Sequence, residues 1–191
     1  MESHGRLELA LVFTLGFFCA IASLYAVQAL HRPIMQTQYC AASVQAIFSP
    51  GSQGDFESFA LSAERTLDAM LYQFSNPGMM ETLAQAAGKG VKVRVLLEPR
   101  VESNYATAEF LANKGVQVRF ASKEYTNTHS KTAVVDGRKV LVGSTNWSRQ
   151  AMRSNRESSV VVESVSLAQE FEKVFEGDWT KAKDFVPSTA G

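Results

Sequence analysis

A histidine and a lysine two positions apart are the residues of this chain whose types and spacing point most directly to chemistry. His129 and Lys131 stand at the start of an apolar run rich in valine. Side chains in a strand alternate between faces, so these two point the same way, whereas Asp136, at odd separation from His129, points to the other face. A neutral imidazole can attack phosphorus, and a neighbouring ammonium can hold the oxygens that gain charge in the transition state. The pair therefore predicts attack on a phosphate ester, with Asp136 in a structural role.

Two small polar residues follow the predicted pair, and their side chains would point the same way because they are two positions apart. Ser144 directly follows Gly143, which lets the backbone turn tightly, and Asn146 comes two residues later. A hydroxyl and a side-chain amide would complete a cradle for phosphate oxygens, although both residues could also begin a helix as caps. No second histidine or carboxylate pair stands at metal-ligand spacing, so the pattern predicts neither a metal ion nor another cofactor.

The string "HSKTAVVD", which begins at His129, and the string "GSTN", which begins at Gly143, resemble the HKD motif of the phospholipase D superfamily. Glu157, in "NRESSVVV", stands where that family places a glutamate that orients the histidine. The similarity extends over nearly all of residues 44–185, through "FSPGSQ", "YQFSNP", "GVKVRVLLEPR" and "FEKVFEGDW". These segments resemble small single-motif members, namely secreted bacterial endonucleases and membrane-anchored mitochondrial-type phosphodiesterases.

The resemblance implies a role for each residue of the motif. His129 would attack the phosphodiester and form a phosphohistidine, which water later hydrolyses. Lys131 and Asn146 would grip phosphate oxygens, Ser144 would support them, and Glu157 would hold the imidazole. Asp136 would brace the motif, which agrees with its side chain pointing to the other face of the strand. Gly143 would also support the motif.

Apolar periodicity predicts an α/β fold in which strands alternate with helices of about ten residues. We expect a mixed, largely parallel sheet flanked by helices, a phospholipase D-like αβα sandwich, because such alternation requires crossover connections. Asp136-Gly137 predicts a hairpin between two of the strands. The predicted strands are 44–48, 69–74, 91–97, 116–120, 130–135, 140–142 and 158–163, and the predicted helices are 55–67, 77–88, 106–113 and 166–183.

The N-terminal region contains 22 consecutive uncharged residues, 9–30, which is enough helix to cross a bilayer. Val27-Gln28-Ala29 offers the small residues that a signal peptidase prefers, so an uncleaved anchor, a removed signal and a buried helix remain open. The expected organisation is a short flank, a transmembrane or signal-anchor helix, a tether, a catalytic domain and a tail, at 1–8, 9–30, 31–43, 44–187 and 188–191. We expect this domain in the periplasm or outside the cell, anchored by the helix or secreted if the leader is cleaved.

The charges are segregated along the chain, although the formal net charge is zero. Residues 89–156 carry 13 Lys and Arg against 5 acidic residues, a net charge of +8, and the flanks on both sides are acidic. This distribution suggests an anionic substrate drawn to one region, or ordinary solvated faces. Arg149, Arg153 and Arg156, spaced four and three apart, would line one helical face and could guide a phosphate backbone, with a solvated face as the alternative.

The small number of histidines predicts a homodimer. Cleavage through a covalent intermediate needs a nucleophile, an acid for the leaving oxygen and then a base for the water. The chain has three histidines, and His4 and His31 flank the apolar segment, which leaves His129. Two chains that bring their copies of His129 together across a two-fold axis would form a composite active site.

The sequence therefore predicts a metal-independent phosphodiesterase, with a nuclease acting on DNA or RNA as the first hypothesis. The alternative is a phospholipase D acting on membrane phospholipids such as cardiolipin, which the membrane segment 9–30 favours. A tethered module that binds anionic polymers without cleaving them is a third. Anchored animal relatives insert a cysteine/histidine zinc element after the first strand, and this chain has no such residues there, which favours the bacterial nuclease type.

Overall fold

The computed structural model describes residue 21 and residues 39–188. The segment 9–30 therefore lies outside the described residues except for Ile21, as do most of the tether and the end of the tail. Among the residues that are described, no helix combines the length and apolar character that crossing a membrane requires. Tyr39–Gly191 forms one compact unit.

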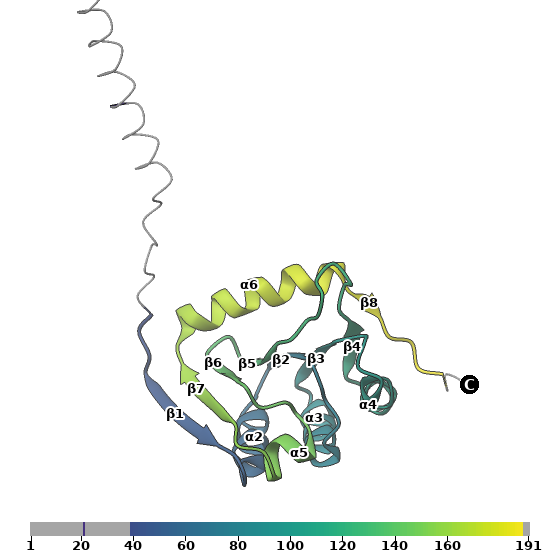
Figure 1. Cartoon of the computed structure of the whole chain (residues 1–191), viewed down its shortest axis with the longest axis horizontal. Helices are drawn as coiled ribbons and strands as arrows, with labels where there is room; N and C mark the ends of the chain where they lie inside the picture. Colours follow the sequence, from purple (N-terminus) through teal and green to yellow (C-terminus); the bar gives the residue numbers. More distant parts are fainter. Residues whose placement is uncertain (1–20, 22–38, 189–191) are drawn as a thin grey trace, which may run out of the picture. The chain divides into compact units, whose positions relative to one another are not determined.

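The described residues form one eight-stranded sheet in the order β1-β7-β6-β5-β2-β3-β4-β8. Helix α6 covers one face, and α2, α3 and α4 lie on the other (Figure 1). The strands are β1 (Ser43–Phe48), β2 (Thr66–Leu71), β3 (Lys92–Leu97), β4 (Gln117–Phe120), β5 (Lys131–Val135), β6 (Lys139–Gly143), β7 (Ser158–Glu163) and β8 (Lys183–Asp184). The helices are α2 (Gln53–Leu61), α3 (Pro77–Gly88), α4 (Ser103–Ala112), α5 (Arg149–Arg153) and α6 (Val165–Lys181).

The sheet is mixed, as predicted, but the prediction that it is largely parallel is wrong. Within the described part, β2, β3 and β4 run parallel, and all the other neighbouring strands pair antiparallel. The crossover helices α3 and α4 explain the parallel pairs. Strands β5 and β6 form the hairpin predicted at Asp136-Gly137, with positive φ angles of 53° and 64° there. Strand β7 then pairs antiparallel with both β6 and β1.

The boundary between α2 and β2 also differs from the prediction. The helical period of apolar residues was expected to continue to 67, yet α2 ends at Leu61 and β2 already begins at Thr66. Leu67 is fully buried as a strand residue, so its apolar character serves the sheet rather than the helix. Periodicity alone cannot separate these two uses of one buried leucine.

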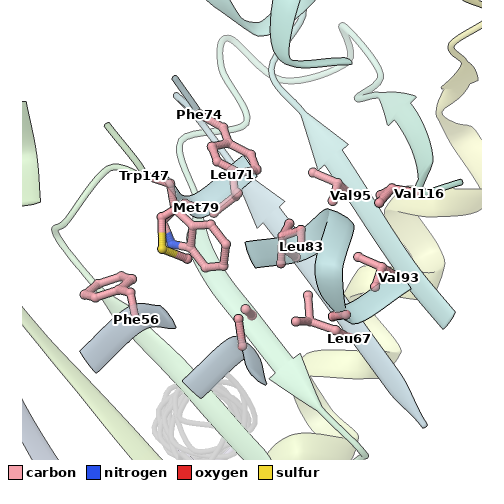
Figure 2. Packing of buried hydrophobic residues seen from close by; sticks show 14 of the residues in the cluster. Phe56, Leu67, Leu71, Phe74, Met79, Leu83, Val93, Val95, Val116 and Trp147 are labelled. Atoms are coloured by element: carbon pink, nitrogen blue, oxygen red, sulfur yellow. The ribbon is translucent and has the colours of Figure 1, made fainter. Parts of the chain in front are cut away.

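A buried tryptophan anchors the segment that follows β6. Figure 2 shows Trp147 among Phe56, Phe74 and Met79, and its ring meets those of Phe56 and Phe74 edge-on at 6.0 and 5.4 Å. The backbone N–H of Trp147 donates to Gln73 O at 3.0 Å, so the backbone is held as well as the ring. Trp147 is fully buried, and its packing fixes the chain immediately after Asn146.

The pairing of the strands brings the motif residues other than Asp136 to one edge of the sheet, the edge formed by the ends of the strands. Strands β2, β3 and β4 all end at this edge because they are parallel. Strand β5 is antiparallel to β2 and therefore begins there, β6 returns to it, and β7 starts from it. We call this edge the active edge.

Candidate active site

His129 and Lys131 lie at the start of β5 on the active edge. Lys131 Nζ is 3.2 Å from Nδ1 and 3.4 Å from Nε2 of His129, and it donates to His129 O at 2.9 Å. An ammonium can only donate, so in these contacts the ring nitrogen is the acceptor. His129 is exposed, whereas Lys131 is buried. The imidazole is thus open to a substrate, with the lysine ammonium beside it.

Burial and a nearby carboxylate act in opposite directions on the lysine. Burial lowers the pKa of Lys131 below its usual value of 10.5, and the negative charge of Glu157 partly raises it again. The carboxylate therefore lies close enough to influence the ammonium, although Lys131 begins β5 and Glu157 comes immediately before β7. This electrostatic link joins the β5 and β7 sides of the site.

Tyr72 supports the imidazole from the end of β2. Its ring centroid lies 4.3 Å from that of His129 at an interplanar angle of 54°, and Lys131 Nζ lies 5.1 Å from the Tyr72 ring centroid. The Tyr72 N–H donates to Ser130 O at 2.7 Å, which fixes the two segments against each other. We did not predict this residue from the sequence, although an aromatic residue at the end of the buried run "AMLYQF" was a possible signal.

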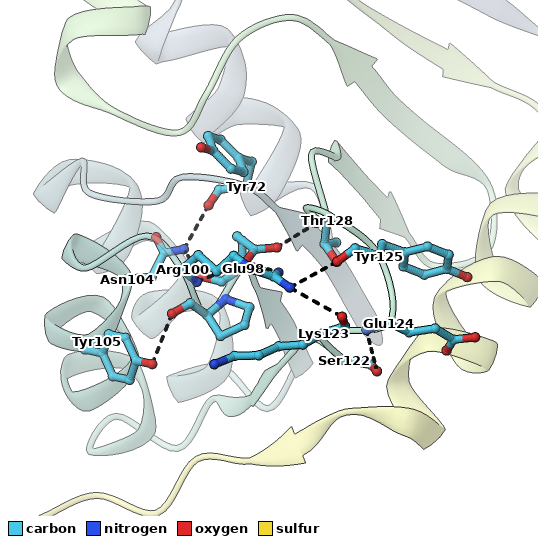
Figure 3. Close-up of polar contacts among 11 residues, drawn as sticks. Tyr72, Glu98, Arg100, Asn104, Tyr105, Ser122, Lys123, Glu124, Tyr125 and Thr128 are labelled. Carbon is cyan, nitrogen blue, oxygen red and sulfur yellow. Dashed lines mark hydrogen bonds and ion pairs between the residues drawn. The ribbon is translucent and has the colours of Figure 1, made fainter.

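A buried carboxylate holds the loop that leads to the histidine (Figure 3). Glu98, fully buried at the end of β3, accepts hydrogen bonds from the Thr128 N–H at 2.6 Å and from Arg100 Nη1 at 2.8 Å. Arg100 Nη2 in turn donates to the carbonyl oxygens of Lys123 at 3.4 Å and Tyr125 at 3.1 Å. We call this arrangement the Glu98–Arg100 clasp. It fixes the residue immediately before His129.

The hydrogen bonds of the clasp keep Glu98 ionised. Burial acts to raise the pKa of Glu98, but the hydrogen bonds from Thr128 and Arg100 and the charge of Arg100 outweigh it, so the pKa lies below its usual value. Asn104 completes the frame, because its Nδ2 donates to Tyr72 O at 2.8 Å and to Glu98 O at 2.9 Å. Sequence reasoning missed Glu98 and Asn104, and an acid closing the apolar run "VRVLLE" was the available signal.

Ser144 and Glu157 meet on the opposite side of the active edge. Ser144 Oγ donates to Glu157 Oε2 at 2.5 Å and accepts from the Ser158 N–H at 3.1 Å. The other carboxylate oxygen, Glu157 Oε1, accepts from Asn155 Nδ2 at 3.0 Å. Between residues 39 and 188 no hydrogen bond joins Glu157 to the imidazole of His129, so the expected contact is not formed within one chain.

Asn146 presents a polar atom without a partner. Its Oδ1 is buried and makes no hydrogen bond with any described residue. Ser52 Oγ and Trp147 Nε1 are likewise buried without a partner, but Asn146 is the one of the three that belongs to the motif, so its amide is available to a group from outside the chain. The oxygen and nitrogen of a side-chain amide can exchange places by rotation, so the same position can also offer a donor.

Comparison with known proteins identifies the family. Residues 58–179, which are more than half of the chain, match the family model described as "Cardiolipin synthase, PLD-like domain". The chain belongs to the phospholipase D superfamily. Among its relatives, the mitochondrial cardiolipin hydrolases of Chlamydomonas reinhardtii and Xenopus laevis are 30% and 33% identical over 71% and 68% of this chain. The chain spans 60% of the length of each of these two relatives.

A solved structure supports the same assignment. Nuc from Salmonella typhimurium, a phospholipase D family member, is 29% identical and superposes with a TM-score of 0.72, covering 75% of this chain and 97% of Nuc. In the described part of this chain the sheet is mixed and helices cover both faces, as predicted (Figure 1). Among the residues described here, no group of three or more His, Cys, Asp or Glu side chains is arranged to hold a metal ion.

Two residues of the phospholipase D motif lie where they support the backbone. Asp136 accepts hydrogen bonds from the N–H groups of Glu64, Arg65 and Thr66 at 3.0, 2.8 and 2.9 Å, which joins the hairpin to the segment before β2. Gly143 was expected to allow a tight turn, but the structure gives another reason for it. A Cβ atom at this position would overlap the backbone of β7, so the glycine permits the close approach of β6 and β7.

The three arginines do not share one helical face. Arg149 and Arg153 belong to α5, but Arg156 lies beyond the end of that helix, so this part of the prediction is wrong. Arg153 Nε donates to Gln53 Oε1 at 3.0 Å, and the Arg156 guanidinium lies 5.7 Å from the Phe48 ring centroid. The helix is short because Ser154 adopts a non-helical conformation, which the spacing of the arginines could not reveal.

Proposed function

We propose that this chain is a metal-independent phosphodiester hydrolase that works through a covalent phosphohistidine at His129. The observation that carries the proposal is the exposed imidazole of His129 with the buried ammonium of Lys131 3.2 Å from its Nδ1. A ring nitrogen attacks phosphorus, the bond from phosphorus to the leaving oxygen breaks, and that oxygen takes up a proton. Water then attacks the phosphohistidine, and the phosphorus–nitrogen bond breaks to restore the imidazole.

The neighbouring side chains stabilise charge at the phosphate in this proposal. Lys131 and Asn146 hold the nonbridging oxygens, which carry most of the charge that develops in the transition state. Ser144 supports this cradle and is itself held by Glu157 at 2.5 Å. Asn146 would contact the phosphate through its Nδ2, which is a donor, and the lack of a partner for Oδ1 among the described residues leaves the amide free to rotate into that orientation.

We propose further that the active unit is a homodimer with a composite site. The leaving oxygen needs an acid while His129 acts as nucleophile, and one imidazole cannot perform both tasks in the same step. The second His129, supplied across a two-fold axis, is the candidate for the acid. The exposure of His129 is compatible with this arrangement.

Mixing experiments test the homodimer. A His129→Ala chain mixed in excess with wild-type chains should lower the activity per wild-type chain, because most wild-type chains then pair with an inactive partner. An activity per wild-type chain that stays constant, or a fully active monomer at high dilution, would rule out the shared site.

Nucleic acid, either DNA or RNA, is the proposed substrate. The net charge of +8 in residues 89–156 supports an anionic polymer, and the exposed Arg149 lies three residues after Asn146. The test is incubation of the purified protein with single-stranded DNA, RNA and cardiolipin vesicles in EDTA, with His129→Ala as the control. We expect cleavage of nucleic acid that persists in EDTA and weakens at high salt. Loss of all phosphodiester cleavage in EDTA would contradict the metal-independent mechanism.

A phospholipid substrate such as cardiolipin is the second candidate. The relatives named mitochondrial cardiolipin hydrolase, at 30% and 33% identity, favour it. In this version the apolar segment 9–30 anchors the protein, and the tether keeps the domain near the bilayer, outside the cytoplasm. Cleavage of the vesicles without cleavage of DNA or RNA in the same experiment would select the lipid.

A further inference from the structure

A hollow lies on the active edge beside the motif, on the side of β4. It has a volume of about 470 Å³ and is lined by residues that follow β3 and β4, by α4 and by the chain after α6. This volume lies within the range of about 300–1,000 Å³ typical of ligand sites. We call it the aromatic–lysine groove, after Tyr105, Phe120, Phe185, Lys123 and Lys183, which all line it.

Three aromatic rings form one wall of the groove. The centroids of Tyr105 and Phe120 are 4.5 Å apart with an interplanar angle of 33°, and Phe120 meets Phe185 edge-on at 5.9 Å. Tyr105 is 48% exposed, and its hydroxyl donates to Pro99 O at 3.1 Å, which fixes the orientation of the ring. An exposed aromatic ring held in one orientation is a platform on which a planar base can stack.

The charged side chains give the groove a positive character. Asp184 is paired with Arg119 at 2.6 Å, and Lys181 is paired with Glu124 at 3.0 Å. Lys123 and Lys183 are exposed and form no ion pair with other residues of the described region. Two lysines without counter-charges therefore stand beside the aromatic wall and attract anionic groups.

The groove is joined to the active site through the Glu98–Arg100 clasp. Arg100 donates to Lys123 O at 3.4 Å, and the same arginine binds Glu98, which holds the Thr128 N–H. Figure 3 shows the Lys123 side chain extending from this loop toward Tyr105. In the sheet order β4 is the third strand from β5, so the two lie about 14 Å apart at about 4.8 Å per strand.

We propose that the aromatic–lysine groove is a subsite for single-stranded nucleic acid and binds the nucleotides next to the scissile phosphodiester. One base stacks on Tyr105, and Lys123 and Lys183 contact the flanking phosphates. Aromatic rings with lysines beside them suit a single strand, whose bases stack on rings and whose phosphates bind cations. The inference rests on the proposed function, because the strand must continue along the active edge to His129.

The test compares a long substrate with a small one. A 12-nucleotide single strand and bis(p-nitrophenyl) phosphate both present a phosphodiester to His129, but the small diester is too short to reach the groove as well. We expect Tyr105→Ala to lower kcat/KM for the oligonucleotide about tenfold relative to kcat/KM for the small diester. Tyr105→Phe, which keeps the ring, should restore the ratio. Lys89→Ala, a change of an exposed lysine at the end of α3, is the matched control.

Binding measured without cleavage separates this inference from the proposed function. In a His129→Ala background, fluorescence anisotropy should show that replacing Lys123 and Lys183 by Ala weakens binding of the labelled oligonucleotide. The slope of log K against log salt concentration should fall by about 1.4, since each phosphate contact to a single strand contributes about 0.7.

Each outcome of these experiments decides one of the two claims. Variants that bind and cleave the oligonucleotide within twofold of the wild type would overturn the subsite, even if the enzyme is an active phosphodiesterase. If the variants lost more activity on cardiolipin vesicles than on the oligonucleotide, this result would overturn the subsite too. Wild-type protein that cleaves neither diester would overturn the proposed nuclease activity instead, while the anisotropy result would still report on the groove.

Discussion

Lys131 Nζ lies 3.2 Å from Nδ1 of His129 and 3.4 Å from Nε2, so the buried ammonium can donate to either nitrogen of the exposed ring. This relationship holds a positive charge beside the ring that is proposed to attack phosphorus. It also makes activity depend on a lysine that is harder to protonate than usual, because burial lowers the pKa of Lys131. The first prediction follows from this dependence.

The alkaline limb of the pH profile should lie below the usual lysine pKa of 10.5, because Lys131 must be charged to hold phosphate oxygens. Glu157 raises the pKa of Lys131, so Glu157→Gln should move the alkaline limb of kcat/KM to lower pH. The control Glu102→Gln, at an exposed position before α4, should leave the limb in place. A limb that moves upward in Glu157→Gln would contradict the proposed coupling.

Glu98→Ala should reduce kcat more than it changes KM. The change removes the acceptor of the Thr128 N–H and releases the loop that carries His129, and a misplacement of about 1 Å can cost up to about 100-fold in rate. Glu98→Gln, which still accepts from Thr128, should lose less. Steady-state kinetics and circular dichroism of both variants, with Glu102→Ala as the control, check this. Wild-type kcat in a folded Glu98→Ala protein would exclude a positioning role.

Gly143→Ala should destabilise the fold by about 1–3 kcal/mol, because the new Cβ overlaps the backbone of β7 and forces β6 and β7 apart. Gly177 in α6 provides a matched control, since a Cβ there meets nothing within 4 Å. Gly177→Ala should stabilise the protein by about 1 kcal/mol through its better helix propensity. Urea denaturation of the three proteins measures both effects, and equal stability of the two variants would refute the packing argument.

Asp136→Asn should lower the free energy of unfolding by about 1–3 kcal/mol at neutral pH. Burial acts to raise the pKa of Asp136, but three backbone N–H groups and Arg65 outweigh it and hold the pKa below 3.8. The ionised carboxylate therefore stabilises the fold above the normal aspartate pKa, and this contribution disappears as the pH falls through the lowered value. The difference between wild type and variant should shrink below about pH 4. A difference that is constant from neutral to acidic pH would contradict the assignment.

The sequence predicted the elements whose signals are local. The helix predicted at 77–88 is α3, which begins at Pro77 and is capped by Asn76, whose side chain accepts from the Gly78 N–H at 3.0 Å. Asp136-Gly137 marked the hairpin, and the spacing of His129 and Lys131 marked the reactive pair. These features depend on neighbouring residues and on fixed backbone geometry, which a single sequence contains.

The supporting residues could not be predicted in the same way. Tyr72, Glu98 and Asn104 come from the ends of β2 and β3 and from α4, and only the pairing of the strands brings them to His129. The alternation of side chains between the two faces of a strand does not reveal which strand lies next to it. The hydrogen bonds of Glu157 within one chain likewise depend on the pairing of β6 with β7.

The central claim is that His129 becomes covalently bonded to phosphorus, and the stereochemical course of the reaction tests it most directly. A phosphorothioate diester of one configuration at phosphorus is cleaved in ¹⁸O-labelled water, and the configuration of the product is determined. Two successive displacements, by His129 and then by water, predict retention of configuration. Inversion would mean that water attacks the diester directly, and it would contradict the account.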